Sequence, residues 1–485
     1  MEIRKFNRIN NIVAVVVLAV ASVTYLSTIE PTASFWDCGE FIASSYKLEV
    51  GHPPGNPVFQ VIARAFTFFG DKMHAAILIN SMSALCSALT IFFLYLTIVH
   101  LVRRISEKKR ELVYANGSNA AGAAEGEFSL GEAIAMYAAG AVGALAYCWS
   151  DTFWFSAVEG EVYAMSSLFT AVVVWAMLKW EEEADEKYAN RWIVLIAVLM
   201  GLSIGVQLLN LLTIPALVLI YYYKKYTVTK KGAFKALLLS FVILAAVLWL
   251  IIPYTPKVAA YTDLLFVNGF GLPVNSGAAF FMVLVLALCF WGVYRTYNKN
   301  KVAWNTIWLC LGTMMIGYSV FAVVIIRSSV NTPTNEYQPD NPFTLVRYLS
   351  REQYGSAPLI YGETYASTLK EIKVPHYYNI MHGKYVKLDA PAEPVYSSDT
   401  KMFFPRMYSS ADPSYADFYN MYTNGNGRYV EGSDAKIPTM GANLKYFFDY
   451  QMNFMYWRYF LWNFVGRQND LQASIPGDIY KGNWE

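Results

Sequence analysis

Charged side chains are scarce in this sequence, and so are the motifs of enzymes that use nucleotides. Asp, Glu, Lys and Arg together make up 15% of the 485 residues, whereas hydrophobic residues make up 55%. This balance is typical of a protein that crosses a membrane several times. The sequence has no Walker A loop, dinucleotide-binding glycine pattern, HExxH zinc motif or Gly-x-Ser-x-Gly elbow. A cytoplasmic site for nucleotides is therefore unsupported, and no nucleic-acid partner is expected.

Cysteine is also rare, and its placement excludes two further classes of protein. Four of the five cysteines fall in apolar runs, and only Cys38 lies in a candidate aqueous loop. No Cys-x-x-Cys pair is present. The sequence therefore predicts neither a disulfide framework nor a cysteine zinc site.

Long apolar runs predict nine membrane-spanning helices. They cover about residues 10–27, 75–102, 132–149, 163–180, 234–252, 277–294 and 304–326, with a tight hairpin of two short helices within 192–223. A run of about 20 apolar residues crosses the roughly 30 Å of hydrocarbon in a bilayer. Nine spans place every Lys/Arg cluster on one side, which the positive-inside rule makes the cytoplasm, together with the N-terminus. A cleaved signal peptide is the competing interpretation of the first run, which is long for one and lacks a clear cleavage site.

Two connecting segments have a distinct composition. Residues 116–127 are rich in Gly, Ala, Ser and Asn, which predicts a flexible cytoplasmic linker. The sequon that begins at Asn116 would then lie on the wrong side of the membrane for glycosylation. Pro253 precedes Tyr254–Ser276, Pro256 lies within it and its stretch Asn268–Pro273 contains two glycines, so we expect an outer loop there.

From residue 328 onward no run is long enough to span a membrane, and Pro, Asp, Asn and Tyr become frequent. Residues 357–360 resemble a strand and 343–354 have helical spacing. The aromatic stretch 446–464 is predicted to be a helix, either in a core or at a lipid surface. The predicted fold class is mainly α: a polytopic membrane helical bundle, residues 1–327, followed by an extracytoplasmic α/β domain, residues 328–485. The chain stops without an evident domain ending, so we expect a fragment of a longer protein.

The first outer loop carries the strongest candidate site. Asp37 and Glu40 would share one face of a helical turn, and His52 follows in a His-Pro-Pro-Gly stretch. A carboxylate here can act as general base toward an acceptor hydroxyl or hold a cation, while His52 and Arg64 suit a phosphate. The alternatives are a solvated loop or helix cap for the acids and a rigid turn for His52.

A second acidic loop and the tip of the hairpin complete the list of candidate residues. Glu159, Glu161 and Tyr163 fall on the same outer face as the first loop, although acids in such loops are often simply solvated. Gln207 and Asn210 lie in the apolar hairpin. They could hydrogen-bond between helices or line a groove for a lipid substrate.

Trp36–Glu40, followed by Gly51–Pro57, resembles the signature of the family 117 glycosyltransferases. Glu159–Tyr163 looks like the second-loop motif of that family, and the hairpin sequence GLSIGVQLLNLL resembles its hairpin. The resemblance covers about residues 10 to 220. The family comprises an animal protein O-mannosyltransferase and a large bacterial branch, and we place this chain with the bacterial members.

The resemblance implies a GT-C fold and a polyprenyl-phosphate sugar as donor. Asp37 would deprotonate a Ser or Thr hydroxyl with Glu40 beside it, and His52 and Glu161 would line the site. Two positions depart from the family pattern: Gly160 stands where Ala is usual, and Gln207 stands where many bacterial relatives have His. The second departure puts an acid-base or phosphate-binding role of the hairpin in doubt.

The predicted function is therefore that of an integral-membrane glycosyltransferase of the bacterial inner membrane, with its C-terminal domain in the periplasm. It would transfer mannose or a similar hexose to exported proteins without a metal, a divalent cation on Asp37 and Glu40 being the disfavoured alternative. Three alternatives remain: transfer to a lipid or polysaccharide, a transporter or flippase, and a non-catalytic role in envelope assembly. Transporters place ionisable groups near the midplane and often contain repeats, whereas these acids lie in outer loops.

Overall fold

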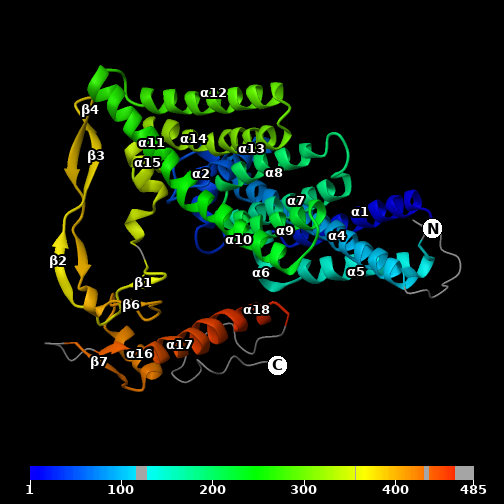
Figure 1. Ribbon diagram of the computed structural model, residues 1–485. Coiled ribbons are helices and arrows are strands. Elements are labelled where there is room, and N and C mark those ends of the chain that lie inside the picture. The colour runs from blue at the N-terminus through cyan, green and yellow to red at the C-terminus, as the bar shows by residue number, and fades with distance from the viewer. Residues whose placement is uncertain (116–127, 356, 431–435, 465–485) are drawn as a thin grey trace. The chain divides into compact units, whose positions relative to one another are not determined.

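The computed structural model describes residues 1–115, 128–355, 357–430 and 436–464 (Figure 1). Contacts divide the chain into a helical unit, Met1–Ser350 with His382–Tyr385, and a second unit, Arg351–Met381 with Val386–Glu485. The predicted linker 116–127 and its sequon lie outside the described residues. The predicted domain boundary after residue 327 stays a prediction.

The described residues contain seven helical segments that are long and apolar enough to cross a membrane. They are α1 (Ile3–Ser27), α4 (Ala75–Ala115), α5 (Leu130–Cys148), α7 (Val162–Glu183), the stretch from α10 (Lys230–Ala246) to Gly269, α12 (Ser276–Asn298), and α13 (Val302–Tyr318) continued by η6 (Ser319–Phe321) and α14 (Ala322–Ser329). The protein is thus a mainly helical, multi-span membrane protein, as predicted.

The remaining two predicted spans form the short hairpin, α8 (Asn190–Ile204) and α9 (Ile214–Lys225), joined by η3 (Leu208–Thr213). The hairpin packs against α13 through two glycines. A Cβ on Gly201 would overlap the backbone of Met314, and one on Gly317 would overlap the backbone of Leu202. Small residues allow helix backbones to approach this closely in membranes, where packing drives association.

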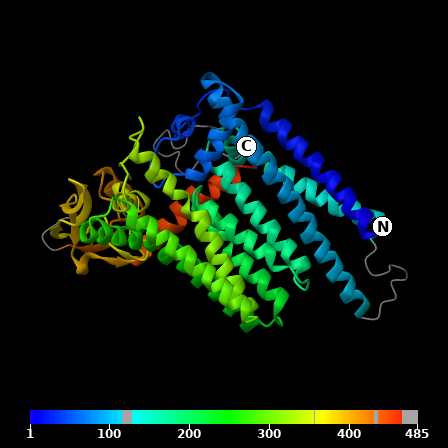
Figure 2. The same cartoon turned by 90° about the horizontal axis from the view of Figure 1, so that it is seen from above.

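Helix α4 lies against α1, α5 and α7 (Figures 1 and 2). The hydroxyl of Tyr25 donates to Cys148 O at 2.9 Å and that of Tyr137 donates to Phe6 O at 3.0 Å, so both of these buried hydroxyl groups are satisfied. On α5, Gly140 leaves room for the ring of Tyr95 on α4. These contacts fix the N-terminal helices on which both acidic loops are mounted.

The predicted outer loop Tyr254–Ser276 is wrong, because the chain remains helical as far as Gly269. The turn η4 (Val247–Ile251) leads into α11 (Ile252–Leu264) and η5 (Leu265–Gly269), with Pro253 in the first turn of α11, where a missing N–H costs little. The buried carboxylate of Asp263 accepts hydrogen bonds from Gly277 N at 2.7 Å, Asn275 N at 3.0 Å and Tyr385 Oη at 2.6 Å. It thereby ties the end of α11 to the start of α12.

The loops between the long helices contain short helices. The loop between α1 and α4 holds α2 (Cys38–Lys47), α3 (Pro57–Phe66), η1 (Thr67–Phe69) and η2 (Lys72–His74), and the loop between α5 and α7 holds α6 (Asp151–Ala157). After α14, the helical unit ends with α15 (Pro342–Leu349), which begins at the cap residue Asn341. Helix α15 contributes to the site described below.

The second unit is built from short antiparallel strand pairs, β1–β6, β2–β5, β3–β4 and β7–β8. The strands are β1 (Tyr361–Gly362), β2 (Leu369–Lys373), β3 (His376–Met381), β4 (Lys384–Asp389), β5 (Glu393–Tyr396), β6 (Met402–Phe403), β7 (Gly427–Tyr429) and β8 (Lys436–Pro438). The predicted strand at 357–360 is wrong, since pairing begins only at Tyr361. Pro358 lies within the predicted segment and has no N–H to contribute to a ladder.

Helices complete the second unit. They are η7 (Glu352–Tyr354), η8 (Ser398–Thr400), α16 (Ser414–Thr423), α17 (Met440–Lys445), η9 (Tyr446–Trp457) and α18 (Arg458–Trp462). The predicted aromatic helix is confirmed as far as Trp462. Its first turns pack on an aromatic cluster, in which Tyr446 contacts Tyr419 and Tyr422. The predicted helix at 343–354 is also confirmed, with a break at Arg351, whose φ is 53°.

Candidate functional site

Helix α2 begins at Asp37, the first acid of the candidate site. Asp37 is the N-cap residue, but its side chain makes no capping hydrogen bond and is 59% exposed. The opposite end of α2 is closed by Arg327, whose Nε donates to Leu48 O at 2.6 Å and whose Nη2 donates to Lys47 O at 3.0 Å. These bonds satisfy carbonyl groups that a helix end leaves without partners. Asp37 is therefore held on a fixed helix with its carboxylate free to meet a substrate.

The segment that leads into Asp37 is fastened to α4. Asn80 Nδ2 donates to Glu30 O at 2.6 Å and to Thr32 O at 2.9 Å. Between this anchor and α2 the indole of Trp36 is 90% exposed, and its backbone has a φ of 59°. A positive φ in a bulky residue is uncommon and is maintained only where the surroundings impose it. An exposed aromatic ring thus stands next to Asp37, a feature that the sequence analysis did not single out.

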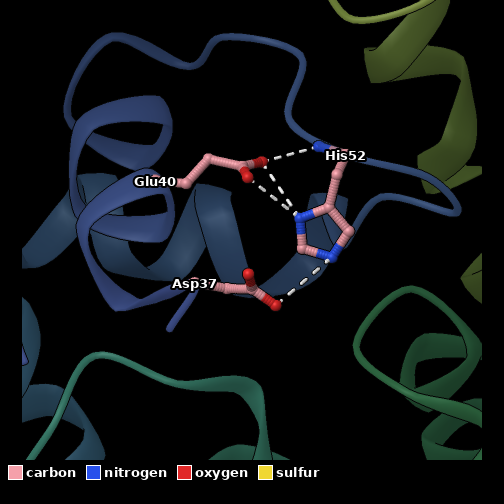
Figure 3. A group of neighbouring side chains, drawn as sticks. All are labelled: Asp37, Glu40 and His52. Carbon is pink, nitrogen blue, oxygen red and sulfur yellow. Dashed lines mark hydrogen bonds and ion pairs between the residues drawn. The ribbon is translucent and has the colours of Figure 1, made fainter. Parts of the chain in front are cut away.

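His52 lies between the two acids of α2 (Figure 3). Its backbone N–H donates to Glu40 Oε1 at 2.6 Å, and its ring Nδ1 lies 3.0 Å from Glu40 Oε2. Its Nε2 lies 3.9 Å from Asp37 Oδ2. The structure thus brings together the three residues that the sequence analysis selected in the first loop.

A glycine and a distant tyrosine hold the His52 turn in place. Tyr348 of α15 is 1% exposed, and its hydroxyl contacts Gly51 O at 2.6 Å and His52 O at 3.3 Å. A Cβ on Gly51 would overlap the carboxylate of Glu40, and one on Gly55 would meet the hydroxyl of Tyr348. Glycine at both positions therefore leaves the space in which Glu40 and His52 make contact.

The contact between Glu40 and His52 shifts both groups toward their charged forms. The side-chain hydrogen bond to Glu40 raises the pKa of His52 above 6.5, although partial burial opposes it. Burial alone would raise the pKa of Glu40, but the hydrogen bonds from His52 outweigh it, so that this pKa is lowered below 4.5. Both shifts favour an imidazolium–carboxylate pair.

The second acidic loop adds two buried carboxylates. Burial raises the pKa of Glu161 to about 7, and the charges of Glu159 and Asp37 add to the rise. Glu161 also caps α7 by accepting a hydrogen bond from Val162 N at 3.2 Å. Burial likewise raises the pKa of Glu159, whose Oε2 has no hydrogen-bond partner among the described residues. The two acidic loops lie beside each other, because Glu30 N donates to Val158 O at 3.1 Å and a Cβ on Gly160 would lie 3.2 Å from Ile42 of α2.

Glu336 is a further acid of the site, and no local sequence pattern marks it. The segment after α14 pairs with the first loop, since Val50 N donates to Thr334 O at 3.0 Å and Glu336 N donates to Val50 O at 3.1 Å. Burial and the charge of Glu40 raise the pKa of Glu336 above 4.5. This neighbour could be found only once the long-range pairing was known.

The other predicted substrate-binding residues have varied surroundings. Arg64 lies 4.9 Å from the ring centres of both Tyr46 and Phe68, and its Nη1 donates to Thr67 Oγ1 at 3.1 Å. It is not among the groups that contact Asp37, Glu40 or His52. Tyr163 is 48% exposed in the first turn of α7. The roles proposed for both residues stay predictions.

Gln207 and Asn210 lie at the tip of the hairpin, as predicted. Asn210 is buried and its Nδ2 donates to Ser203 Oγ at 3.0 Å, a bond between the two sides of the hairpin. This is the structural role that the sequence analysis kept as an alternative. Oε1 of Gln207 is buried and has no hydrogen-bond partner among the described residues. Whether either residue contacts a substrate stays a prediction.

The donor atoms of Asp37, Glu40 and His52 all lie within 4.8 Å of one another, which is close enough for them to share a metal ion. However, both oxygens of Glu40 already contact His52. A metal-binding histidine often donates its second ring N–H to a carboxylate in this way. The expectation that the site works without a metal therefore stays a prediction.

Parts of the chain are similar to known proteins. Residues 37–230 match the family model of the protein O-mannosyl-transferase TMEM260 N-terminal domain, and residues 355–448 match a family of unknown function. The protein O-mannosyl-transferase tmem260 of Dictyostelium discoideum is 25% identical over 166 residues, 33% of this chain and 16% of that protein. The mouse protein O-mannosyl-transferase TMEM260 is 25% identical over 207 residues, 42% of this chain and 24% of that protein. No solved structure matches.

These findings support a class before any particular activity: a multi-span membrane protein with a region similar to the N-terminal domain of protein O-mannosyltransferases. The matched region begins at Asp37 and includes every candidate residue named from the sequence. The matches span less than a quarter of the length of either relative. The resemblance stated from the motifs is thus confirmed at the level of an O-mannosyltransferase-like region.

Proposed function

We propose that this protein transfers a sugar, mannose or a similar hexose, from a polyprenyl-phosphate donor to Ser or Thr hydroxyls of exported proteins. The observation that carries the proposal is the exposed, uncapped carboxylate of Asp37, held 3.9 Å from a histidine that is itself fixed by Glu40. Such a group has both the position and the freedom to accept a proton from a hydroxyl. It also begins the region that is similar to protein O-mannosyl-transferases.

The proposed reaction is a single displacement of GT-C type. The acceptor oxygen attacks C1 of the sugar while its proton passes to Asp37. The bond between C1 and the phosphate oxygen breaks, and the polyprenyl phosphate leaves with the electron pair. One sugar is transferred with inversion at C1. Because phosphate is a good leaving group, a base at the acceptor suffices in this account without a metal ion.

His52 provides the positive charge of the proposed site. Glu40 occupies its Nδ1, so Nε2–H is the ring donor left to face Asp37 and the substrates. Several acids surround this one cation, among them Glu161 and Glu336. A phosphate enters such surroundings most readily when those two acids are protonated, which their raised pKa values favour. We propose that Glu161 lines the donor side of the site.

The proposed setting is the outer face of a bacterial inner membrane, with the N-terminus in the cytoplasm and the second unit in the periplasm. The charge pattern supports it, since Arg103, Arg104 and the following basic residues lie at the end of α4 that is remote from the acidic loops. The membrane delivers the activated donor, and exported proteins supply the acceptor.

The test uses full-length protein in membranes with radiolabelled polyprenyl-phosphate mannose and a panel of envelope proteins. Label on Ser or Thr of a protein supports the proposal. If label appears only on lipid or polysaccharide, the protein is still a glycosyltransferase, but its acceptor is not a protein. Absence of transfer with several sugars, together with movement of a lipid or ion across vesicles, would replace the proposal with a transporter.

A further inference from the structure

A cavity of about 330 Å³ lies between α1, α4 and α7, at the end of these helices that carries the basic residues. Its polar lining on α4 begins at His100, whereas the candidate active site precedes Ala75, where α4 starts. Twenty-five helical residues rise roughly 40 Å. The cavity is therefore near the opposite membrane surface and takes no part in the proposed transfer reaction.

Three asparagines of α1 line one side of this cavity. Asn7, Asn10 and Asn11 are spaced i, i+3 and i+4, so they share one face of the helix. Oδ1 of Asn10 is buried and has no hydrogen-bond partner among the described residues. A primary amide is costly in an apolar membrane environment unless its hydrogen bonds are made. The amide of Asn10 therefore offers a hydrogen bond to something that occupies the cavity, and the exposed amides of Asn7 and Asn11 lie beside it.

The other side of the cavity carries charged groups from α4 and α7. Arg103 Nη2 donates to Glu182 Oε1 at 2.5 Å, and Lys179 Nζ donates to Glu182 Oε2 at 2.6 Å. Nδ1 of His100 lies 3.2 Å from Glu182 Oε1. The carboxylate of Glu182 thus contacts two permanently charged side chains and a histidine. In addition, Glu181 contacts His100 and Glu107 contacts Arg103. Arg103 lies 3.6 Å from Glu107 Oε1, so it can turn to a second anion without losing all of its contacts.

On α4 and α7 the lining of the cavity changes from polar to apolar with depth, whereas α1 lines it with Phe6 and the three asparagines. Leu96 and Val99 precede His100 on α4, and Trp175 and Leu178 precede Lys179 on α7, so these apolar side chains line the part nearer the membrane centre. A polar rim at the surface above an apolar floor matches a phospholipid, whose head group lies at the interface and whose chains run inward. A free phosphate would leave the floor in contact with water.

We propose that this cavity binds the phosphodiester head group of an anionic phospholipid from the leaflet on the basic side of the membrane. Arg103 and Lys179 hold the phosphate oxygens, and the asparagine amides of α1 bind the remaining head-group oxygens. The first methylene groups of an acyl chain cover the ring of Trp175. The lipid joins α1 to α4 and α7, so its binding stabilises this helix group.

The test compares lipid binding by purified full-length protein in detergent, using native mass spectrometry and thermal unfolding. The probes are phosphatidylglycerol, phosphatidylcholine and inorganic phosphate. The variants are Asn10→Leu, which removes the buried amide and leaves every ion pair in place, and Lys179→Gln. The matched control is Lys230→Gln with Lys231→Gln, an exposed basic pair at the start of α10.

Phosphatidylglycerol is expected to bind about tenfold more tightly than phosphatidylcholine and to raise the unfolding temperature. Each cavity variant should lose about tenfold in this affinity, the loss expected from one charge-assisted or buried hydrogen bond, whereas the control should bind as the wild type does. Equal binding of the two lipids would overturn the proposal, as would unchanged binding in both cavity variants. A full thermal shift with inorganic phosphate alone would assign the site to free phosphate and overturn the lipid assignment.

Discussion

Glu40 holds His52 by both its backbone and its ring, with Oε1 2.6 Å from the backbone nitrogen and Oε2 3.0 Å from Nδ1. This double contact fixes the position of the imidazole and favours its charged form. Everything proposed for Asp37 depends on it, because His52 is the cation that the structure places beside that carboxylate.

Glu40→Gln should therefore change the pH dependence of transfer. Loss of the carboxylate removes the main cause of the raised pKa of His52, so the imidazole becomes neutral at a lower pH. Sugar transfer by the variant should fall as pH rises from 6 to 8, while the wild type holds its activity further up this range. Rates measured across these pH values check the prediction. Glu371→Gln, on the exposed strand β2, is the control, and parallel profiles for Glu40→Gln and wild type would contradict the assigned pair.

The same pair predicts how stability responds to pH. His52 has a raised pKa in the folded protein, so its contribution is complete below about 6.5 and is lost as pH rises through the raised value. Glu40 has a lowered pKa, so its contribution is present above 4.5 and is lost as pH falls through the lowered value. Thermal unfolding measures this contribution as the unfolding temperature of the wild type minus that of His52→Gln. This difference should become smaller at both ends of the pH range. A constant difference would show that the two groups are not ionised as a pair.

Gly51→Ala should reduce activity without unfolding the helical bundle. The added methyl group would overlap the carboxylate of Glu40 and push it from His52. Gly131→Ala is the matched control, because a Cβ at Gly131 meets nothing within 4 Å. Transfer rates and unfolding temperatures measured together separate the two effects. Equal activity of the two variants would mean that the contact between Glu40 and His52 does not matter for transfer.

Glu161→Gln should make the stability of the protein less dependent on pH near neutrality. The pKa of Glu161 is raised to about 7 by burial, so its contribution to stability is present below 4.5 and is lost as pH rises through about 7. The wild type should become less stable between pH 5 and pH 8, and the glutamine variant should be much less sensitive over this range. Unfolding temperatures at several pH values provide the measurement. If the unfolding temperatures of both proteins change equally with pH, the group that titrates is not Glu161.

Removal of divalent cations should leave transfer intact. The imidazolium of His52 stands where a metal would have to bind between Asp37 and Glu40. Protein treated with EDTA and assayed in metal-free buffer is expected to retain its rate within about twofold. If EDTA abolishes activity and Mg²⁺ or Mn²⁺ restores it, the three residues hold a metal cation. The proposal that His52 provides the positive charge of the site would then be wrong.

The membrane bundle and the first-loop acids could be predicted from sequence because their signals are local. Long apolar runs define the spans by length, and the spacing of Asp37 and Glu40 places both on one helical turn. The prolines at 253 and 256 were misread as the start of a loop. The π-helical turn η4 and the first-turn position of Pro253 let the helix continue.

The parts of the site that were missed depend on contacts between distant residues. Tyr348 reaches Gly51 across 297 positions of sequence, and Glu336 reaches the first loop through the pairing of Val50. Neither residue stands in a motif, and an isolated Tyr or Glu in a polar segment is ordinary. Their relation to His52 arises only when α15 and the segment after α14 fold back on the first loop.

The most direct test of the account measures transfer by wild type, Asp37→Asn and the control Asp417→Asn, an exposed residue of α16. Full-length protein in membranes receives saturating labelled polyprenyl-phosphate mannose and a single identified acceptor protein. Asparagine keeps the shape of aspartate but cannot accept the proton, so the rate should fall about 100-fold or more while the control stays at the wild-type rate. A rate for Asp37→Asn within a few-fold of wild type would contradict the assignment of Asp37 as the base and with it the proposed site.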